Sequence, residues 1–216
     1  MGRALLLSLQ VLACTIPLIV LLGGWAGWIL ARKEFPGKTF FSLLAQLPLI
    51  LPPSVMGFYL LFFLGKTPWL RNLGILFSFP ALVIAAVVSA SPIMIQAARA
   101  AFASVDRDLE DVGRTLGKGE GTIFLSITLP LARRTLLVGV ALSAARALGD
   151  FGVSLMVAGN MPGRTQTLPL YIYNQVETLS FGRANLAALL LVGAGFASLL
   201  FVRSLESGRN ESHASR

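Results

Sequence analysis

The stretch from Ala4 to Ala31 contains no charged residue. A helix needs about 20 apolar residues to cross a bilayer, and this stretch is long enough to do so. The apolar region of a cleaved signal peptide is shorter and is followed by a small-residue cleavage site, of which this stretch has no convincing example. We therefore expect a retained membrane helix at the start of the chain.

Similar uncharged stretches recur along the chain and account for its composition. They cover Thr39–Gly65, Asn72–Ala98 and Ala184–Val202, and a shorter one begins at Thr135 and stays apolar to about Ala158. Hydrophobic residues make up 55% of the chain and charged residues 13%, whereas soluble domains carry about 25% charged residues. We predict an all-α integral membrane protein with about five transmembrane helices, and exclude a disordered chain, a nucleic-acid-binding domain and a secreted disulfide scaffold.

Basic residues lie between the apolar stretches and predict how the chain crosses the membrane. The formal net charge is +8. With five spans, one side of the membrane collects Arg32, Lys33, Lys38, Arg99, Arg107, Arg114, Lys118, Arg133, Arg134, Arg203, Arg209 and Arg216. The other side collects only Arg3, Lys66, Arg71, Arg164 and Arg183. Because loops rich in Lys and Arg stay in the cytoplasm, we expect the N-terminus outside and the C-terminus inside.

Residue counts and spacing exclude two kinds of site. Cys14 is the only cysteine and His213 the only histidine, so a metal site built from Cys and His is excluded. No Gly-Lys pair fits the ATP-binding pattern Gly, four residues, Gly-Lys-Ser/Thr: the glycine that this pattern needs is replaced by Arg32 in one case and Leu60 in another. We expect no catalytic residue and no cofactor bound by this chain.

Small residues and prolines interrupt the apolar stretches. Gly23 and Gly27 have the spacing of closely packed membrane helices. A single proline is consistent with an ordinary kink. Two adjacent prolines, Pro52 and Pro53, followed by Ser54 near the start of a span, predict an opened helix that lines a path, since the freed backbone groups need protein or a cavity beside them.

The longest polar segment before the tail spans about residues 99–134. Val105, Leu109, Val112 and Leu116 recur at spacings of four, three and four, which places them on one face of an amphipathic helix. Gly117 follows as a helix end, and a second short helix over residues 123–128 is expected before the fourth span. The spacing leaves two interpretations open: a helix lying in the lipid headgroups, or a helix that docks a cytoplasmic partner.

Two ionisable residues lie inside the fourth span. Arg146 is about 16 Å from the start of that span, near the bilayer midplane. Asp150 follows four residues later, on the same face of a continuous helix, so the two side chains can pair. A charge at this depth costs about 2.5–3.5 kcal/mol, so the pair faces protein or water. It either fixes helix packing or shapes the gate of an anion path.

The segment after this span, residues 159–169, is expected on the outer side. It is rich in glycine, proline and hydroxyl side chains, with a single charge at Arg164. It is either a plain turn-rich loop or a surface beneath a binding protein. In the second case Asn160, Thr165 and Thr167, with Gln166, donate hydrogen bonds to a passing oxyanion without holding it tightly.

The segment DVGRTLGKGEGTIFLSITLP, residues 111–130, resembles the EAA loop of ABC importer membrane subunits. The acidic position corresponds to Asp111, the small residues to Val112 and Gly113, and the glycine to Gly117, with Thr115 and Leu116 between them. Ile127, Leu129 and Pro130 correspond to the end of the motif. The family has Glu and Ala where this chain has Asp111 and Val112. The resemblance implies that these residues couple the chain to an ATPase.

The resemblance extends over almost the whole chain, through residues 46–61 and 145–173, to permease subunits of molybdate ABC importers. Asp150 stands where that family usually has Glu. The resemblance implies a type I ABC importer permease in the bacterial inner membrane, with residues 1–203 as one permease domain and 204–216 as a short polar cytoplasmic tail. It also implies a homodimer, two cytoplasmic ATPase subunits that use ATP and Mg, and an external molybdate-binding protein.

Three alternatives differ in substrate or class. A sulfate or thiosulfate permease shares the same framework. A stand-alone oxyanion carrier needs internal repeats and coupling carboxylates near the midplane, of which only Asp150 is available. A membrane anchor without a pore leaves the prolines and the Arg146–Asp150 pair without a role. The leading interpretation is translocation of molybdate, or of the similar oxyanion tungstate.

Overall fold

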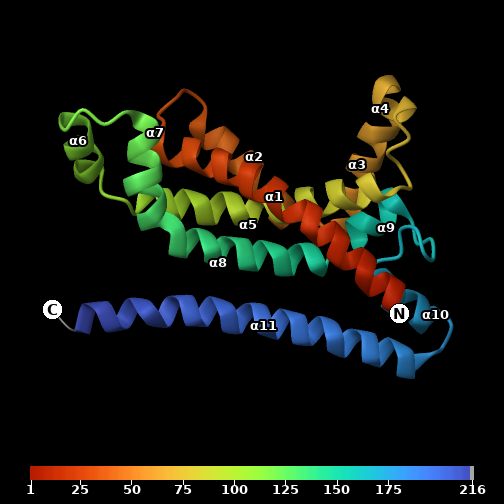
Figure 1. Ribbon diagram of the computed structural model, residues 1–216. Coiled ribbons are helices and arrows are strands. Elements are labelled where there is room, and N and C mark those ends of the chain that lie inside the picture. Colours follow the sequence, from red (N-terminus) through yellow and green to blue (C-terminus); the bar gives the residue numbers. More distant parts are fainter. Residues whose placement is uncertain (215–216) are drawn as a thin grey trace.

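The protein is described here by a computed structural model that covers the backbone of residues 1–214 and the side chains of residues 1–205. Within that part the regular structure is entirely helical (Figure 1). In chain order the helices are α1 (Gly2–Arg32), α2 (Lys38–Ile50), α3 (Pro53–Lys66), α4 (Pro68–Asn72), α5 (Phe79–Ala103), α6 (Arg107–Thr115), α7 (Glu120–Ile123), the π-helix η1 (Phe124–Thr128), α8 (Leu129–Leu148), α9 (Gly152–Ala158), α10 (Leu168–Glu177) and α11 (Phe181–Ala214).

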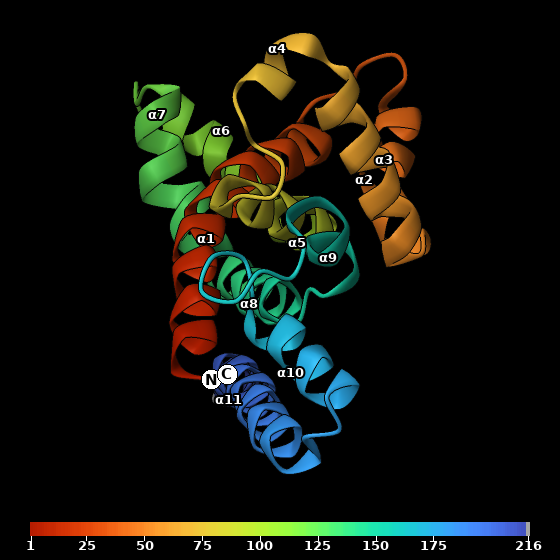
Figure 2. The same ribbon diagram turned by 90° about the vertical axis from the view of Figure 1, so that its right-hand side faces the viewer.

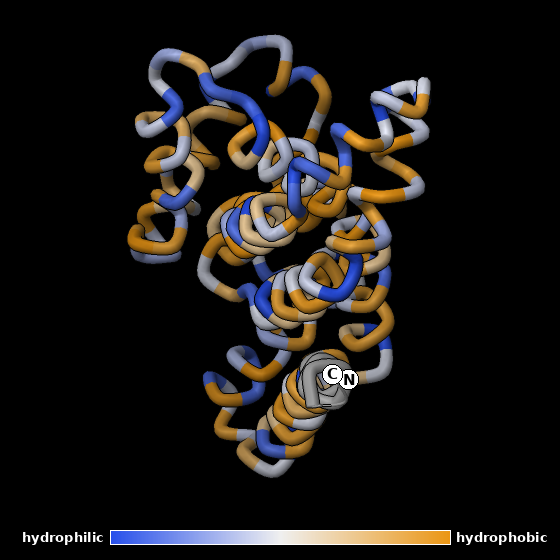
Figure 3. Tube along the Cα trace, turned by 90° about the vertical axis from the view of Figure 1, so that its left-hand side faces the viewer, coloured by the Kyte–Doolittle hydropathy of each residue, from blue (hydrophilic) through white to orange (hydrophobic). Residues whose placement is uncertain are grey.

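Four helical segments are long and apolar enough to cross a membrane, and a fifth crossing is possible through a bent pair. The four are α1, α5, the continuous run Glu120–Leu148 and Phe181–Leu205 of α11. Along these helices most of the chain has the orange colour of hydrophobic residues (Figure 3). The prediction of an all-α protein with about five membrane spans is confirmed.

The second apolar stretch is not one straight helix. Helices α2 and α3 meet at an angle of 114°, with the break at Leu51 and Pro52. Pro53 is the first residue of α3, where a missing N–H costs nothing, and it holds Pro52 in an extended conformation. The predicted interruption at the two prolines is confirmed.

The fourth span also differs from the prediction of one helix running to about Ala158. Helix α8 ends at Leu148, the chain turns at Gly149, and α9 begins at Gly152. The Asp150 carboxylate accepts a hydrogen bond from the backbone N–H of Ser154 at 3.0 Å, which satisfies an amide that would otherwise lack a partner in the first turn of α9. The side chain therefore stabilises the break that the apolar pattern conceals.

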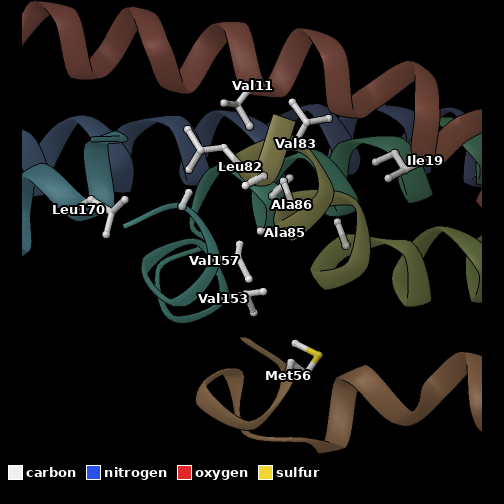
Figure 4. Packing of buried hydrophobic residues seen from close by; sticks show 14 residues of the cluster. Val11, Ile19, Met56, Leu82, Val83, Ala85, Ala86, Val153, Val157 and Leu170 are labelled. Carbon is white, nitrogen blue, oxygen red and sulfur yellow. The ribbon is translucent and has the colours of Figure 1, made fainter. Parts of the chain in front are cut away.

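The core forms where α1 crosses α5. A Cβ atom at Gly27 would lie 2.5 Å from the Cβ of Ala98, so only glycine allows this approach, and one at Gly23 would lie 3.0 Å from the Cβ of Met94. The predicted role of the two glycines is confirmed. Side chains from six helices converge in the neighbouring cluster: Val11 and Ile19 of α1, Leu82 and Ala86 of α5, Met56 of α3, Ala147 of α8, Val153 and Val157 of α9, and Leu170 of α10. Figure 4 shows this cluster.

The two ends of the bundle differ in what they carry. Helices α6 and α7 lie at one end together with the C-terminus, whereas the N-terminus, α4 and α10 lie at the other (Figure 1). Helix α11 packs on α8 and α10 along the edge of the bundle (Figure 2). It continues to Ala214, so helix extends through most of the segment predicted as a polar tail; residues 215 and 216 of that segment lie outside the described residues.

Candidate functional site

Helix α6 projects from the end of the bundle and exposes an apolar face. It covers Arg107–Thr115 and is capped by Asp106, whose carboxylate accepts the Asp108 N–H at 3.0 Å. Of the four residues predicted to share a face, Val105 is buried, whereas Leu109, Val112 and Leu116 are 48%, 56% and 72% exposed. The apolar face therefore points away from the protein, as expected for a docking surface or an interfacial helix.

The helix ends in a turn that requires glycine. Gly117 has φ +74°, and its N–H donates to the Arg114 carbonyl at 2.9 Å. The next N–H, from Lys118, donates to the Gly113 carbonyl at 3.1 Å. These two bonds form a Schellman motif, which fixes the direction in which the chain leaves α6. The predicted helix end at Gly117 is confirmed.

The inner side of α6 packs against the helical run that leads to α8. A Cβ atom at Gly113 would lie 3.2 Å from side-chain atoms of both Ile123 and Ile127, so a small residue is required for this approach. Leu129 is partly buried and Pro130 exposed one turn later. Pro130 lacks the N–H that would continue the hydrogen bonds of the helix, and the turn before it is a π-helix. The motif residues Gly113 and Ile127 thus meet in space.

A buried ion pair ties α6 to the end of α1. The Arg32 guanidinium lies 2.7 Å from the Glu110 carboxylate, and the two side chains are only 10% and 9% exposed. The same carboxylate oxygen accepts the Thr128 hydroxyl at 2.6 Å, and Arg32 also donates to the Val105 carbonyl at 3.3 Å. The sequence does not indicate this group, because its members are far apart in the chain and Glu110 resembles its exposed acidic neighbours.

On the outer side of α6, Arg114 joins two exposed carboxylates. Its guanidinium donates to Glu120 at 2.6 and 3.1 Å and also pairs with Asp111. Glu120 and Asp111 together raise the pKa of Arg114, so the guanidinium stays charged. Exposed ion pairs of this kind contribute little to stability. Asp111 and Thr115 are themselves exposed, so both are accessible to a partner.

The predicted intramembrane pair lies at the break between α8 and α9. Arg146 and Asp150 approach to 3.7 Å, with 32% and 1% of their side chains exposed. The Asp150 carboxylate also accepts the hydroxyls of Ser89 at 3.0 Å and Ser154 at 2.6 Å. Asp150 thus joins α5, α8 and α9, while Arg146 extends toward the surface. The pair exists, but not within one continuous helix as predicted.

The prolines of the second span pack beside this break. A Cβ atom at Gly152 would lie 2.8 Å from the Cβ of Pro53, and one at Gly57 would lie 2.7 Å from the Cβ of Met156. Helix α3 therefore lies directly on α9. Pro52 and Ser54 are exposed beside this contact. The structure brings together the two interrupted segments that the sequence singled out separately.

The loop after α9 uses its polar side chains internally. The side-chain amide oxygen of Asn160 accepts a hydrogen bond from the Gln166 side-chain amide at 3.0 Å, and the Thr165 hydroxyl accepts the Met161 N–H at 3.1 Å. Thr165 and Thr167 are buried, and the Thr167 hydroxyl has no partner in the described part of the chain. The hydrogen bonds of Asn160 and Thr165 stabilise the conformation of the loop. The predicted contact of Asn160, Thr165 and Thr167 with a passing anion stays a prediction.

A family model described as the inner membrane component of binding-protein-dependent transport systems matches residues 15–210. The chain belongs to this family. It is thus a multi-pass inner membrane permease subunit of an ABC importer, as the EAA-like loop and α6 indicate. Such subunits are not themselves enzymes.

Individual relatives include molybdenum and sulfate permeases. The putative molybdenum transport system permease protein YvgM of Bacillus subtilis is 39% identical over 204 residues, 91% of this chain and 90% of the relative. The molybdenum permease ModB of Escherichia coli K12 is 36% identical over 91% of this chain and 89% of its own. The sulfate permease CysW of Synechocystis is 34% identical over 88% of this chain and 72% of its own.

A solved structure supports the fold of the permease. The inward-facing methionine ABC transporter MetNI contains a chain that matches with a TM-score of 0.70, over 95% of both chains, at 17% identity. At that identity the match establishes the fold alone. The predicted type I importer permease fold is confirmed.

Proposed function

We propose that this permease translocates molybdate, or the similar oxyanion tungstate. The observation that supports this substrate is the match to two molybdenum permeases, which covers about nine tenths of this chain and of each relative. The sulfate permease of Synechocystis is almost as similar in sequence, and the chain covers 72% of its length. Sulfate or thiosulfate is therefore the second candidate.

The transporter that we propose is a homodimer of this permease with two cytoplasmic ABC ATPase subunits and an external molybdate-binding protein. Five spans in one chain do not enclose a pathway for a hydrated dianion, so a second copy completes it. ATP and Mg bind to the ATPase subunits, since this chain has no sequence that fits a phosphate-binding loop.

Coupling runs through α6 in this proposal. Its exposed Leu109, Val112 and Leu116 insert into a groove of the ATPase, in the manner of an amphipathic helix docking through one apolar face. Asp111, Thr115 and Gly117 surround that face. When the two ATPases close on ATP, the bound helices move together and change the side from which the anion path opens.

The gate in this proposal lies where α3 meets the α8–α9 break. Pro52, Pro53 and Ser54 flank the break, and Arg146 supplies positive potential for a dianion while Asp150 holds its orientation. Asn160, Thr165 and Thr167 shape the outer loop beneath the binding protein. An importer must release its cargo, so these residues guide the anion and do not bind it tightly.

Anion uptake in the native host tests the substrate and the coupling together. Deletion of the gene is expected to abolish accumulation of labelled molybdate at low external concentration and to leave sulfate uptake intact. The wild-type gene restores uptake, and Gly117→Asp, which places a carboxylate beside the apolar docking face, does not. Loss of sulfate uptake with molybdate intact would reassign the substrate and keep the permease. Normal uptake of both anions would refute the proposed substrates.

A further inference from the structure

An apolar groove runs along the membrane-spanning parts of α1 and α8. Its volume is about 760 Å³, and its walls include Leu21, Gly24 and Trp25 of α1 and Leu137 and Val140 of α8. Leu21 and Trp25 are among the most exposed apolar side chains of α1. The groove therefore accepts a hydrophobic occupant from within the bilayer.

A polar hollow of about 670 Å³ lies beside the groove at its cytoplasmic end, between α1, α6 and α7. Trp28 and Phe124 line both spaces, so the two are adjacent, and together they are called the cleft. The apolar part lies in the spans, and the polar part lies at the end that carries most of the basic residues. An amphipathic molecule with its polar end toward the cytoplasm matches this division.

The charges of the cleft favour an anion at its polar end. Four cations line the hollow, Arg32, Lys33, Arg107 and Arg114, against three carboxylates, Glu110, Asp111 and Glu120, so its net charge is +1. Lys33 and Arg107 form no ion pair within the described part of the chain, and the Lys33 ammonium lies 5.7 Å from the centre of the Trp28 ring.

A third cation, Arg133, lines the apolar groove itself. It is exposed, and the residues that the structure describes provide it with no carboxylate. A guanidinium beside an apolar groove at the membrane boundary is well placed for a phosphate, which it binds in a fork geometry.

We propose that this cleft binds one anionic phospholipid of the cytoplasmic leaflet. An acyl chain fills the groove between α1 and α8, and the phosphate faces Arg133, Lys33 and Arg107. Basic pockets between transmembrane helices on the cytoplasmic side recognise such headgroups. The uncharged stretches of a second copy of this chain would leave Arg133 unpaired, which favours lipid over a protein helix as the occupant.

Lipid retention by the complete transporter, permease with its ATPase, tests the site without reference to the transported anion. The complex is purified in mild detergent and mixed with phosphatidylglycerol or phosphatidylcholine of the same acyl chains, and bound lipids are counted by native mass spectrometry. The wild-type complex is expected to retain one phosphatidylglycerol per permease and much less phosphatidylcholine.

Two variants separate the headgroup from the chain. Arg133→Gln is expected to lower phosphatidylglycerol binding about fivefold, since a basic residue near the surface contributes about 1 kcal/mol. Gly24→Leu fills the groove and is expected to lower binding of both lipids; a Cβ atom there meets no other atom within 4 Å, so the fold is not strained. The matched controls are Arg183→Gln at the opposite end and Gly193→Leu on α11, where a Cβ atom is equally free.

Two results would overturn the proposal. One is equal lipid retention by the wild type and both cleft variants. The other is a photo-crosslinking residue at Leu137 that captures the second copy of the permease and no lipid, because a protein helix would then occupy the groove. Either result leaves the proposed transport function untouched, since uptake is measured separately.

Discussion

The carboxylate of Glu110 and the guanidinium of Arg32 lie 2.7 Å apart and connect the exposed helix α6 to the cytoplasmic end of α1. Thr128 joins the same oxygen from the segment that leads into α8. A displacement of α6 is therefore transmitted to two spans through one buried group. The other ion pair in the described part of the chain between α6 and a membrane-spanning run, Arg114 with Glu120, is exposed at the surface, with 42% and 73% of the two side chains accessible.

Glu110→Gln is expected to weaken this connection. Removing one charge leaves Arg32 buried without compensation, and breaking such a pair costs about 3–5 kcal/mol. We expect a lower thermal midpoint of the purified complex and ATP hydrolysis that responds less to the binding protein. Asp108→Asn, an exposed acidic residue on the same helix, is the matched control. A Glu110→Gln complex with normal stability and normal coupling would contradict the role assigned to the pair.

The turn at Gly117 gives a prediction that depends on backbone conformation alone. A Cβ atom there meets no neighbour within 4 Å, yet φ is +74°. Gly117→Val is expected to cost about 1–2 kcal/mol locally and to redirect the chain after α6. Gly117→Asn, which tolerates this conformation, is expected to retain most of the transport activity. Uptake assays of the two variants at equal expression make the comparison, and equal loss in both would show that bulk and not conformation is critical.

Gly113 allows α6 to approach Ile123 and Ile127. Alanine places its Cβ 3.2 Å from Cγ1 of Ile123 and Cδ1 of Ile127, which a shift of a few tenths of an ångström relieves, so Gly113→Ala is expected to be far milder than Gly113→Leu. Gly113→Leu overfills the contact and is expected to cost about 1–3 kcal/mol, or to detach α6 from the bundle. Protease sensitivity of residues 106–120 and co-purification of the ATPase report the detachment. Unchanged values for Gly113→Leu would contradict close packing at this position.

The sequence predicted the features that depend on local pattern. Uninterrupted apolar stretches are specific to membrane helices, and the spacing of Leu109, Val112 and Leu116 fixes one face whatever surrounds it. The proline pair predicted the break before α3, because proline restricts the backbone of its own and the preceding residue. The spacing of Gly23 and Gly27 also indicated close helix packing, but glycine pairs are frequent in membrane helices, and the spacing does not identify α5 as the partner.

Other features depend on contacts between distant segments and were not accessible. The apolar pattern continues through the α8–α9 break, which is stabilised by Ser89 and Ser154 on either side of Asp150. The Arg32–Glu110 pair joins residues 78 positions apart, and nothing in the local sequence distinguishes Glu110 from Asp111. The two acids differ in burial: Glu110 is buried and pairs with Arg32, whereas Asp111 is exposed to solvent.

The Asp150 cluster yields a prediction that separates packing from electrostatics. Asp150→Ala removes the acceptor for Ser89 and Ser154 and is expected to cost about 1–3 kcal/mol, with a lower yield of the complex. Arg146→Gln leaves those hydrogen bonds in place and removes the cation beside the buried Asp150 carboxylate. If Arg146 shapes the anion path, this variant assembles normally and takes up molybdate more slowly. Normal assembly, uptake and ATPase coupling in Arg146→Gln would leave the pair with a packing role only.

The exposed end of α6 gives the most direct test of the docking face. Leu116 is 72% exposed and contributes nothing to the core, so Leu116→Asp is expected to leave the folding of the permease unchanged. If the apolar face inserts into an ATPase groove, a carboxylate there is buried without a partner, and the ATPase no longer co-purifies with the permease. Leu73→Asp is the matched control, because Leu73 is 65% exposed and lies at the opposite end of the bundle. Equal recovery of the ATPase with both variants would favour the other interpretation of the amphipathic pattern, in which α6 lies in the lipid headgroups.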